Sequence, residues 1–352
     1  MSAATSSASK AVNSMKAVIL KAVGEFAIVD KPIPKISDPD DLLIKIEASS
    51  ICGSDVHIFA NPPGIPAVIG TTIGHEMVGC VQKIGSGVTD FKPGDRLVLD
   101  NNVPCGHCYS CRTGHPNMCQ HMRTIGVDAD GAFAEYAVVP ARMAVKISPE
   151  LPTETAIFAE PLNCVMGAMD KIRLLPGENV LIMGAGPIGL YFTKLLKLNG
   201  AGKIFISEVS PFRAQYAKDC GATRVIDPTK ENLTEIILQE TNGIGVDVAV
   251  DAVGVLLPGC IDAVKCNGRV LLFGNNSSIK ETICQADITR KELTVMGSYV
   301  GPHTLPATVN LLESGILDLS HLITHRIKLS EFAEGMAAMR KGEAIEVVIT
   351  PN

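Results

Sequence analysis

Four cysteines stand close together in the first third of the chain and could bind a metal ion. Two, two and seven residues separate them in turn, and their segment contains glycine and proline and few apolar residues. Four thiolates around one Zn²⁺ make a closed tetrahedral site, which stabilises a small segment but leaves no open position for chemistry. We expect a structural zinc lobe over residues 100–122, with an iron–sulfur cluster or disulfides as alternatives. The four residues are Cys105, Cys108, Cys111 and Cys119.

A glycine-rich loop in the middle of the chain has a pattern that binds dinucleotides. The sequence Gly184-Ala185-Gly186-Pro187-Ile188-Gly189 follows the apolar run NVLIM and precedes a helix-like run, which is the setting that this motif requires. Gly184 permits the tight turn, Gly186 lets the backbone approach a pyrophosphate, and Gly189 allows close packing of helix on strand. We expect the N–H groups at the start of the helix to face the phosphates.

An acidic residue follows this loop at the distance where dinucleotide sites recognise the ribose. Glu208 ends the next apolar run, and a carboxylate there accepts hydrogen bonds from both ribose hydroxyls and repels a 2′-phosphate. This favours NAD over NADP. Arg213 could flank the adenine or accommodate a phosphate, so the sequence leaves NADP open.

Two further short runs contain residue types that bind metals or move protons. They are CGSDVH at residues 52–57 and GHE at residues 74–76. Thiolates, imidazoles and carboxylates are all zinc ligands, and histidine also titrates near neutral pH. Neither spacing is diagnostic by itself, because a single Cys or His is more often a packing residue.

The composition excludes several classes of protein. Of the 352 residues, 46% are hydrophobic and 19% are charged, and the net charge is −6. These values are typical of a folded chain of about two domains, and they provide no basic surface for nucleic acid or an anionic membrane. No apolar run reaches the roughly 20 residues of a membrane-spanning helix, and the first residues lack a secretory signal core. With an odd number of cysteines, 11 in all, these features favour a cytoplasmic protein without a disulfide framework.

The character of the sequence changes near residue 175. Before residue 148, short alternating runs separated by Gly and Pro predict a β-rich barrel or sandwich. After residue 175, near-continuous apolar runs alternate with helix-like runs, which predicts a parallel sheet covered on both faces. We expect a flexible tail at residues 1–14, a first domain formed by residues 15–162 and 303–352, and an inserted parallel-sheet domain at residues 163–302.

Taken in order, these motifs resemble those of the zinc-dependent medium-chain dehydrogenase/reductase family. The resemblance extends from Met15 to the C-terminus and includes CGSDVH, GHE, the four cysteines, DGAFAEY, AEPL, GAGPIG and THRIKLSEFAEGM. It is closest to the polyol (sorbitol-type) and L-threonine dehydrogenase branches. The resemblance implies an α/β protein with a GroES-like β-rich catalytic domain and a Rossmann domain with a doubly wound parallel sheet.

The resemblance also implies a second, catalytic zinc ion. Cys52 and His75 would be ligands, and we expect Glu76 as the third. Glu160 would be a neighbouring carboxylate that can exchange with Glu76, and Cys164 is a further alternative. One thiolate and one carboxylate neutralise Zn²⁺ and leave a position for an alcohol.

The same resemblance assigns a proton route and further cofactor contacts. Ser54 would take the alcohol proton and pass it through the nicotinamide ribose to His57 at the surface. Contacts with the nicotinamide half of NAD are expected at the ends of the late strands. These residues are Phe273, Gly274, Asn275, Ser298 and Tyr299.

The sequence indicates the type of reaction more clearly than it indicates the substrate. The loop after His57 lacks the Trp-containing stretch of threonine dehydrogenases and the Tyr usual in sorbitol dehydrogenases, and residues 297–301 lack the arginine of the latter. We expect oxidation of a secondary alcohol, namely a polyol, cyclitol or sugar alcohol, with L-threonine or another β-hydroxy amino acid as the alternative. A non-catalytic dinucleotide sensor is a further alternative. Family members are dimers or tetramers, and the run ELTVMGS could pair as a sheet edge.

Overall fold

The computed structural model describes residues 14–276 and 279–351, which form two compact units. The first unit contains the described residues up to Glu160 and from Ile323 onward, and the second contains Pro161–Leu322. The flexible tail expected at residues 1–14 lies, apart from Ser14, outside the described residues.

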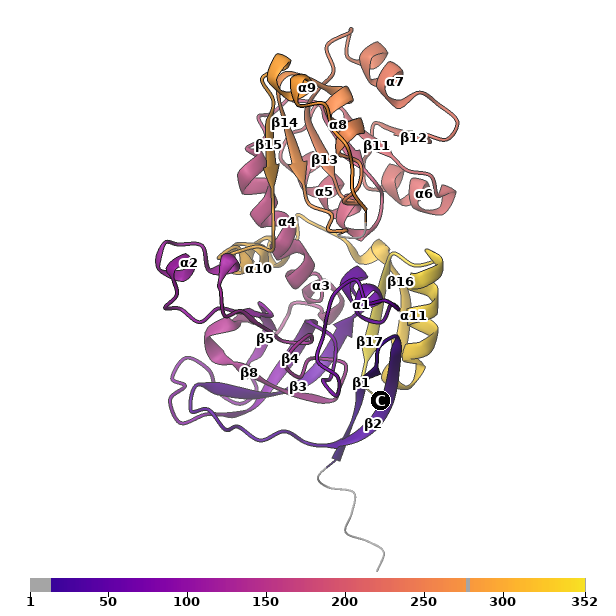
Figure 1. The fold of residues 1–352 in the computed structure, drawn as a ribbon. Helices are drawn as coiled ribbons and strands as arrows, with labels where there is room; N and C mark the ends of the chain where they lie inside the picture. The colour runs from indigo at the N-terminus through magenta and orange to yellow at the C-terminus, as the bar shows by residue number, and fades with distance from the viewer. Residues whose placement is uncertain (1–13, 277–278, 352) are drawn as a thin grey trace, which may run out of the picture. The chain divides into compact units, whose positions relative to one another are not determined.

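The first unit is built on a seven-stranded sheet with the order β16-β17-β3-β4-β5-β9, in which β8 also pairs with β3 (Figure 1). Alternating apolar residues of these strands, such as Leu42 and Ile44, are fully buried, as the sequence pattern predicted. The pairs β1-β2 and β6-β7 are separate. The strands are β1 (Ser14–Ala22), β2 (Glu25–Pro32), β3 (Asp41–Ser50), β4 (Glu76–Ile84), β5 (Arg96–Leu99), β6 (Asn102–Val103), β7 (Arg123–Thr124), β8 (Tyr136–Pro140), β9 (Ala144–Ile147), β16 (Ile323–Lys328) and β17 (Glu346–Thr350).

The helices of the first unit are short. The α-helices are α1 (Gly53–Ile58), α2 (Tyr109–Arg112), α3 (Thr153–Ala156) and α11 (Phe332–Lys341). Single 3₁₀ turns are η1 (Pro116–Met118), η2 (Ala141–Met143) and η4 (Leu329–Glu331).

The second unit contains a six-stranded parallel sheet with the order β12-β11-β10-β13-β14-β15. The strand order reverses between β10 and β13, as in a doubly wound Rossmann fold, so the expected fold class is confirmed. The strands are β10 (Val180–Met183), β11 (Ile204–Ser207), β12 (Arg224–Ile226), β13 (Val246–Asp251), β14 (Val264–Leu272) and β15 (Thr294–Gly297). The helices are α4 (Ala159–Ile172), whose first two residues belong to the first unit, α5 (Pro187–Leu198), α6 (Pro211–Asp219), α7 (Leu233–Glu240), α8 (Leu257–Ala263), α9 (Gln285–Arg290), α10 (Leu305–Glu313) and the turn η3 (Ser320–Leu322). Among the described residues, no helix is long and apolar enough to cross a membrane.

The chain leaves the second unit at Ile323 and not at residue 303, where we expected the return. The reason is a contact at the start of α10. The hydroxyl of Thr304 donates to the carbonyl oxygen of Asn163 over 2.9 Å, and a Cβ on Gly301 would collide with that same carbonyl group. This close approach fastens α10 to α4, so the segment after residue 303 belongs to the parallel-sheet unit.

Arg96 connects several segments of the first unit. Its guanidinium pairs with the Glu47 carboxylate of β3 over 2.8 Å and donates to the backbone carbonyls of Ser148 and Leu151 over 3.2 and 2.7 Å. The Arg96 side chain is largely buried. These contacts connect β5 and β3 to the chain segment that leads towards α3.

Replacing Arg96 with Ala should lower the free energy of unfolding by about 2–4 kcal/mol, because the half-buried Glu47 carboxylate and the carbonyl groups lose a charged donor. Guanidinium chloride denaturation followed by circular dichroism would measure the change. Arg96→Lys keeps the charge but not the forked geometry of the guanidinium. Its free energy of unfolding should therefore lie between those of the wild type and Arg96→Ala. A wild-type midpoint for Arg96→Ala would contradict this role.

Candidate active site

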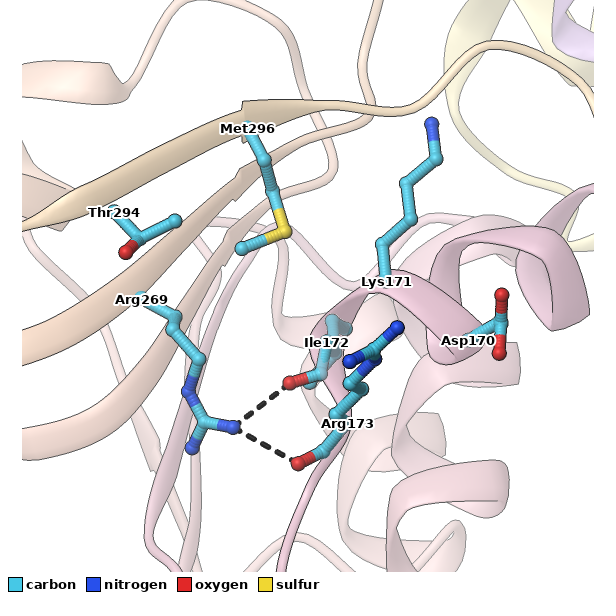
Figure 2. Close-up of a pocket in the computed structure, with 7 residues that line it drawn as sticks. All are labelled: Asp170, Lys171, Ile172, Arg173, Arg269, Thr294 and Met296. Atoms are coloured by element: carbon cyan, nitrogen blue, oxygen red, sulfur yellow. Dashed lines mark hydrogen bonds between the residues drawn. The ribbon is translucent and has the colours of Figure 1, made fainter.

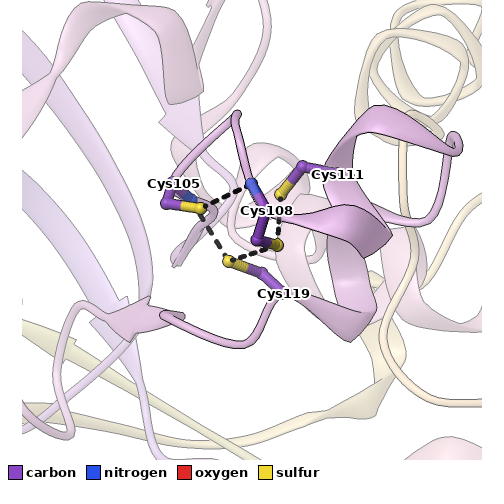
Figure 3. Close-up of side chains that lie close together, drawn as sticks. All are labelled: Cys105, Cys108, Cys111 and Cys119. Carbon is purple, nitrogen blue, oxygen red and sulfur yellow. Dashed lines mark hydrogen bonds between the residues drawn. The ribbon is translucent and has the colours of Figure 1, made fainter.

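The four cysteines of the lobe between β6 and β7 converge on one point (Figure 3). Their Sγ atoms all lie within 4.8 Å of one another, and Cys108 Sγ lies 3.5 Å from Cys111 Sγ and 3.9 Å from Cys119 Sγ. All four are free thiols and none is in a disulfide. Four sulfur donors in this arrangement fit a tetrahedral zinc ion and leave no position open.

Backbone N–H groups favour negative charge on these sulfurs. The N–H of Cys105 donates to Cys119 Sγ over 3.3 Å, and the N–H of Cys108 donates to Cys105 Sγ over 3.4 Å. Backbone N–H donors of Cys111 and Gln120 lower the pKa of Cys108 to about 6, whereas desolvation and the neighbouring Cys108 raise the pKa of Cys111 to about 12. The N–H donors thus favour the thiolate at Cys108, the form that binds metal, whereas Cys111 must lose its proton when a cation binds.

Cys52, His75 and Glu76 form a second group, and their donor atoms also lie within 4.8 Å of one another. Strand β3 ends at Ser50 and β4 begins at Glu76, and these two residues face each other in the antiparallel pair. Cys52 follows the first strand and His75 precedes the second, so the strand register brings the donors together. A thiolate, an imidazole and a carboxylate fit a zinc ion that keeps a fourth position open.

Neighbouring polar groups hold the His75 ring. Its Nδ1 lies 3.5 Å from Oδ1 of Asp55, a fully buried carboxylate whose Oδ2 accepts a hydrogen bond from the Cys52 N–H over 2.9 Å. Nδ1 and Oδ1 form no hydrogen bond in the structure, but a carboxylate on this side of the ring favours hydrogen on Nδ1, which leaves Nε2 for a metal. The Ser54 hydroxyl lies 3.2 Å from Nε2. Asp55 was not expected from the sequence, although the third position of a helix is typical of a side chain that bonds back to the helix start.

Without a metal, His75 favours its protonated form. Burial opposes the charged ring, but Asp55 and Cys52 outweigh it and hold the pKa of His75 well above its usual value. A metal that binds at Nε2 therefore displaces a proton, which makes its affinity depend on pH.

Glu76 is the carboxylate that has an oxygen within 4.8 Å of the donor atoms of Cys52 and His75. The hydroxyl of Ser50 donates to Glu76 Oε2. Burial and neighbouring negative charges, including Glu346, raise the pKa of Glu76 well above its usual value. Glu160 is buried in the first turn of α4 and has a weaker influence on that pKa, but it is not among the grouped donors. Cys164, the other alternative, belongs to the second unit.

His57 lies exposed in the last turn of α1. The N–H of Gly64 donates to the His57 carbonyl over 2.9 Å, and a Cβ on Gly64 would lie 3.2 Å from His57 Nδ1. The absence of a side chain at Gly64 thus leaves room for the imidazole at the surface.

The glycine-rich loop connects β10 to α5 in the second unit. Gly184 has a φ of 96°, which glycine adopts without strain, and a Cβ on Gly189 would lie 2.0 Å from the Gly184 carbonyl oxygen. No atom lies within 4 Å of a Cβ built on Gly186, so the loop is open there. Gly186 caps α5, which begins with Pro187 and Ile188, and the N–H groups of this first turn can bind a phosphate.

Glu208 lies directly after β11 and bonds to the same loop. Its Oε2 accepts a hydrogen bond from the Ala185 N–H and its Oε1 one from the Ser210 N–H, each over 2.7 Å. The carboxylate therefore stabilises the loop, and each oxygen retains a lone pair for a ribose hydroxyl. Arg213, in the first turn of α6, has a buried Nε without a hydrogen-bond partner. A ligand acceptor at Nε would satisfy this group.

The late-strand residues lie at the carboxyl ends of the parallel sheet, where such folds bind ligands. Phe273, Gly274 and Asn275 follow β14, and Ser298 and Tyr299 follow β15. A Cβ on Gly274 would collide with the backbone of Val253 and Gly254, and the Ser298 hydroxyl is buried without a hydrogen-bond partner.

A cavity of about 430 Å³ lies in the second unit, between the end of α4 and strands β14 and β15 (Figure 2). None of the residues that line it was expected to bind a ligand. The Arg269 guanidinium donates to the carbonyls of Ile172 and Arg173 over 2.8 and 2.9 Å and pairs with Glu178 over 2.5 Å. Arg269 therefore caps α4, and we assign no ligand to this cavity.

Comparison with known proteins assigns the chain to a family. Residues 38–149 match the model of the alcohol dehydrogenase GroES-like domain, and residues 187–314 match that of the zinc-binding dehydrogenase. The chain is 37% identical over 339 residues to an L-threonine 3-dehydrogenase of Caldanaerobacter subterraneus, with 92% of this chain and 95% of the relative covered. It is 32% identical over 345 residues to a sorbitol dehydrogenase of Bacillus subtilis, with 96% and 98% covered. The chain belongs to the zinc-dependent medium-chain dehydrogenase family.

A solved structure of the same family supports the fold. A zinc-binding dehydrogenase from Sinorhizobium meliloti 1021 bound to NADP has a TM-score of 0.92 and 33% sequence identity, with 97% of this chain and 100% of that chain covered. The protein is therefore a dehydrogenase with a GroES-like domain, from a family that acts on small-molecule alcohols. The expected family and fold class are confirmed.

Cys108→Ser should remove one zinc equivalent per chain and lower the thermal midpoint by at least about 5 °C, because the lobe has too little apolar core to keep its shape without the metal. Elemental analysis and a thermal melt would measure both. Cys266→Ser is the matched control, since Cys266 is exposed and lies outside both donor groups. Unchanged zinc content and midpoint in Cys108→Ser would contradict the structural-metal assignment.

Proposed function

We propose that the protein oxidises a secondary alcohol, namely a polyol, cyclitol or sugar alcohol, to a ketone with NAD as the acceptor. Each chain would bind a catalytic zinc through Cys52, His75 and Glu76 and a structural zinc through the four-cysteine lobe. The observation on which this proposal depends most is the grouping of these three donors within 4.8 Å, with the buried Asp55 behind His75.

The donor set suits a catalytic zinc. One thiolate and one carboxylate balance the charge of Zn²⁺, and three protein ligands leave one coordination position open. Zinc supplies a Lewis acid that lowers the pKa of an alcohol hydroxyl, and NAD supplies the acceptor for the hydride that leaves the carbinol carbon.

The chain's own residues orient the ligands and move the proton. The Asp55 carboxylate, 3.5 Å from Nδ1 of His75, favours hydrogen on that nitrogen and leaves Nε2 available. The Ser54 hydroxyl, 3.2 Å from that nitrogen, is placed to receive the substrate proton, and the exposed His57 in the same helix releases it to solvent. Glu160 contributes negative charge near Glu76 without acting as a ligand.

We propose NAD as the cofactor because Glu208 presents a carboxylate beside the glycine-rich loop. Its negative charge disfavours a 2′-phosphate, whereas the unsatisfied Nε of Arg213 favours an additional acceptor. The Glu208 carboxylate bonds directly to the glycine-rich loop, so we expect Glu208 and not Arg213 to determine the preference for NAD over NADP.

Two observations bear on the substrate. The loop after His57 has neither the Trp-containing stretch of threonine dehydrogenases nor the Tyr of sorbitol dehydrogenases. The 37% identity to an L-threonine 3-dehydrogenase supports a second candidate, oxidation of L-threonine or another β-hydroxy amino acid.

We propose that the chain assembles as a homodimer or homotetramer. Strand β15 is at the end of the parallel sheet, and its outer edge can pair with a second copy.

A panel of polyols, cyclitols and L-threonine, each with NAD, tests the proposed reaction through the absorbance of the reduced cofactor. We expect turnover with at least one secondary alcohol, and Cys52→Ser should reduce it by at least about a thousandfold while NAD binding persists. Cys266→Ser should have wild-type activity. Absence of turnover across the panel in zinc-loaded protein would favour a dinucleotide sensor and contradict the proposal.

Glu208→Ala should lower the ratio of kcat/KM for NAD to that for NADP by at least about tenfold, because it removes the ribose acceptor and the repulsion of a 2′-phosphate. Glu208→Gln keeps one carbonyl acceptor and should give a smaller change. A thermal melt of each variant would detect loss of the loop contacts. An unaltered ratio would show that Glu208 does not contact the ribose.

A further inference from the structure

Glu346 lies opposite one of the proposed metal ligands. It is the first residue of β17, which pairs antiparallel with β3. The N–H of Ile51 donates to the carbonyl of Val347 over 3.1 Å, so these two residues face each other. Cys52 lies beyond the end of β3 but is still extended, so the same register continued by one residue places Glu346 opposite Cys52. Facing residues of an antiparallel pair project to the same side, so Glu346 shares the side of the metal-binding group.

The Glu346 side chain is enclosed with other acidic groups. Glu346 is 3% exposed, Glu76 is 2% exposed and Asp55 is fully buried. The negative charge of Glu346 also contributes to the raised pKa of Glu76, after burial and Cys52, which agrees with a short separation. The Ser50 hydroxyl donates a hydrogen bond to Glu76 Oε2 and so restrains the Glu76 side chain.

Buried anions that are held together require a neighbouring positive charge to be stable. The group of Cys52, His75 and Glu76 offers three protein donors to a metal, one fewer than the four-cysteine lobe. Retention of an ion at this three-donor group therefore depends more on the surrounding charges than it does in the four-cysteine lobe. Coulomb attraction falls only as the inverse of distance, so a carboxylate beyond bonding distance still stabilises Zn²⁺.

We infer that Glu346 is a positioning residue of the metal site, an anion outside the ligand set that slows the loss of Zn²⁺ from Cys52, His75 and Glu76. This inference rests on the proposed catalytic zinc. Glu346 acts through its charge, and it needs no contact with substrate or cofactor.

The test measures zinc release from the full-length, zinc-loaded protein into an excess of a chromophoric chelator. Wild-type protein should release two equivalents in two phases, and Cys52→Ser and Cys108→Ser identify the phases by each losing one. In Glu346→Gln the phase that depends on Cys52 should be at least about tenfold faster, with the other phase unchanged. Glu346→Asp retains the charge and should stay within about threefold of wild type.

Glu154→Gln is the matched control, because it removes one negative charge from an exposed ion pair with Arg326 in the same unit. Its release phases should be those of wild type. Circular dichroism and the retained four-cysteine zinc confirm folding of each variant. If Glu346→Gln does not fold, the isosteric pair Glu346→Asn and Glu346→Asp decides: a rate at least about tenfold faster in Glu346→Asn than in Glu346→Asp supports the inference, and equal rates in the two variants overturn it.

The outcomes separate this inference from the proposed function. Release of a single equivalent by the wild-type protein would overturn the catalytic zinc itself. Two equivalents with a wild-type rate in Glu346→Gln would leave the zinc site intact and overturn the role of Glu346. Equal acceleration in Glu346→Gln and Glu346→Asp would assign the effect to packing and would also overturn the inference.

Discussion

The register of the β3–β4 pair is the constraint on which the candidate active site depends. Ser50 faces Glu76 at the ends of the two strands, and this pairing brings Cys52 beside His75 although the two lie far apart in the sequence. A shift of one residue would turn the side chains of one strand to the opposite face of the sheet. The Ser50–Glu76 hydrogen bond and the Asp55–His75 contact then fix the donors within this frame.

The two metal-binding groups are stabilised in different ways. The four-cysteine lobe is local: its donors belong to one short segment with little secondary structure, and backbone N–H groups prepare the sulfurs for a cation. The second group is non-local and lies on the main sheet, where burial raises the cost of each charge. A site of the second kind needs neighbouring groups that orient and balance it, and Asp55 and Glu346 are placed to do so.

Local motifs were predictable from the sequence, and contacts set by strand pairing were not. The four cysteines and the glycine-rich loop each lie in one segment, so their spacing alone predicts their geometry. Ser50 bonds to Glu76, and the charge of Glu346 influences it, only through the pairing of β17, β3 and β4, which no spacing in the sequence indicates. The boundary expected at residue 303 differs from the division into compact units at Ile323, and the bond from Thr304 to Asn163, which is distant in the chain, is not visible in the sequence.

The most direct test of this account is a crystal structure of the active protein with data collected on both sides of the zinc absorption edge. The account predicts two anomalous peaks per chain, one surrounded by the four cysteine sulfurs and one bonded to Cys52 Sγ, His75 Nε2 and a Glu76 oxygen. A single peak, at the four cysteines, in protein that still turns over a secondary alcohol would contradict it.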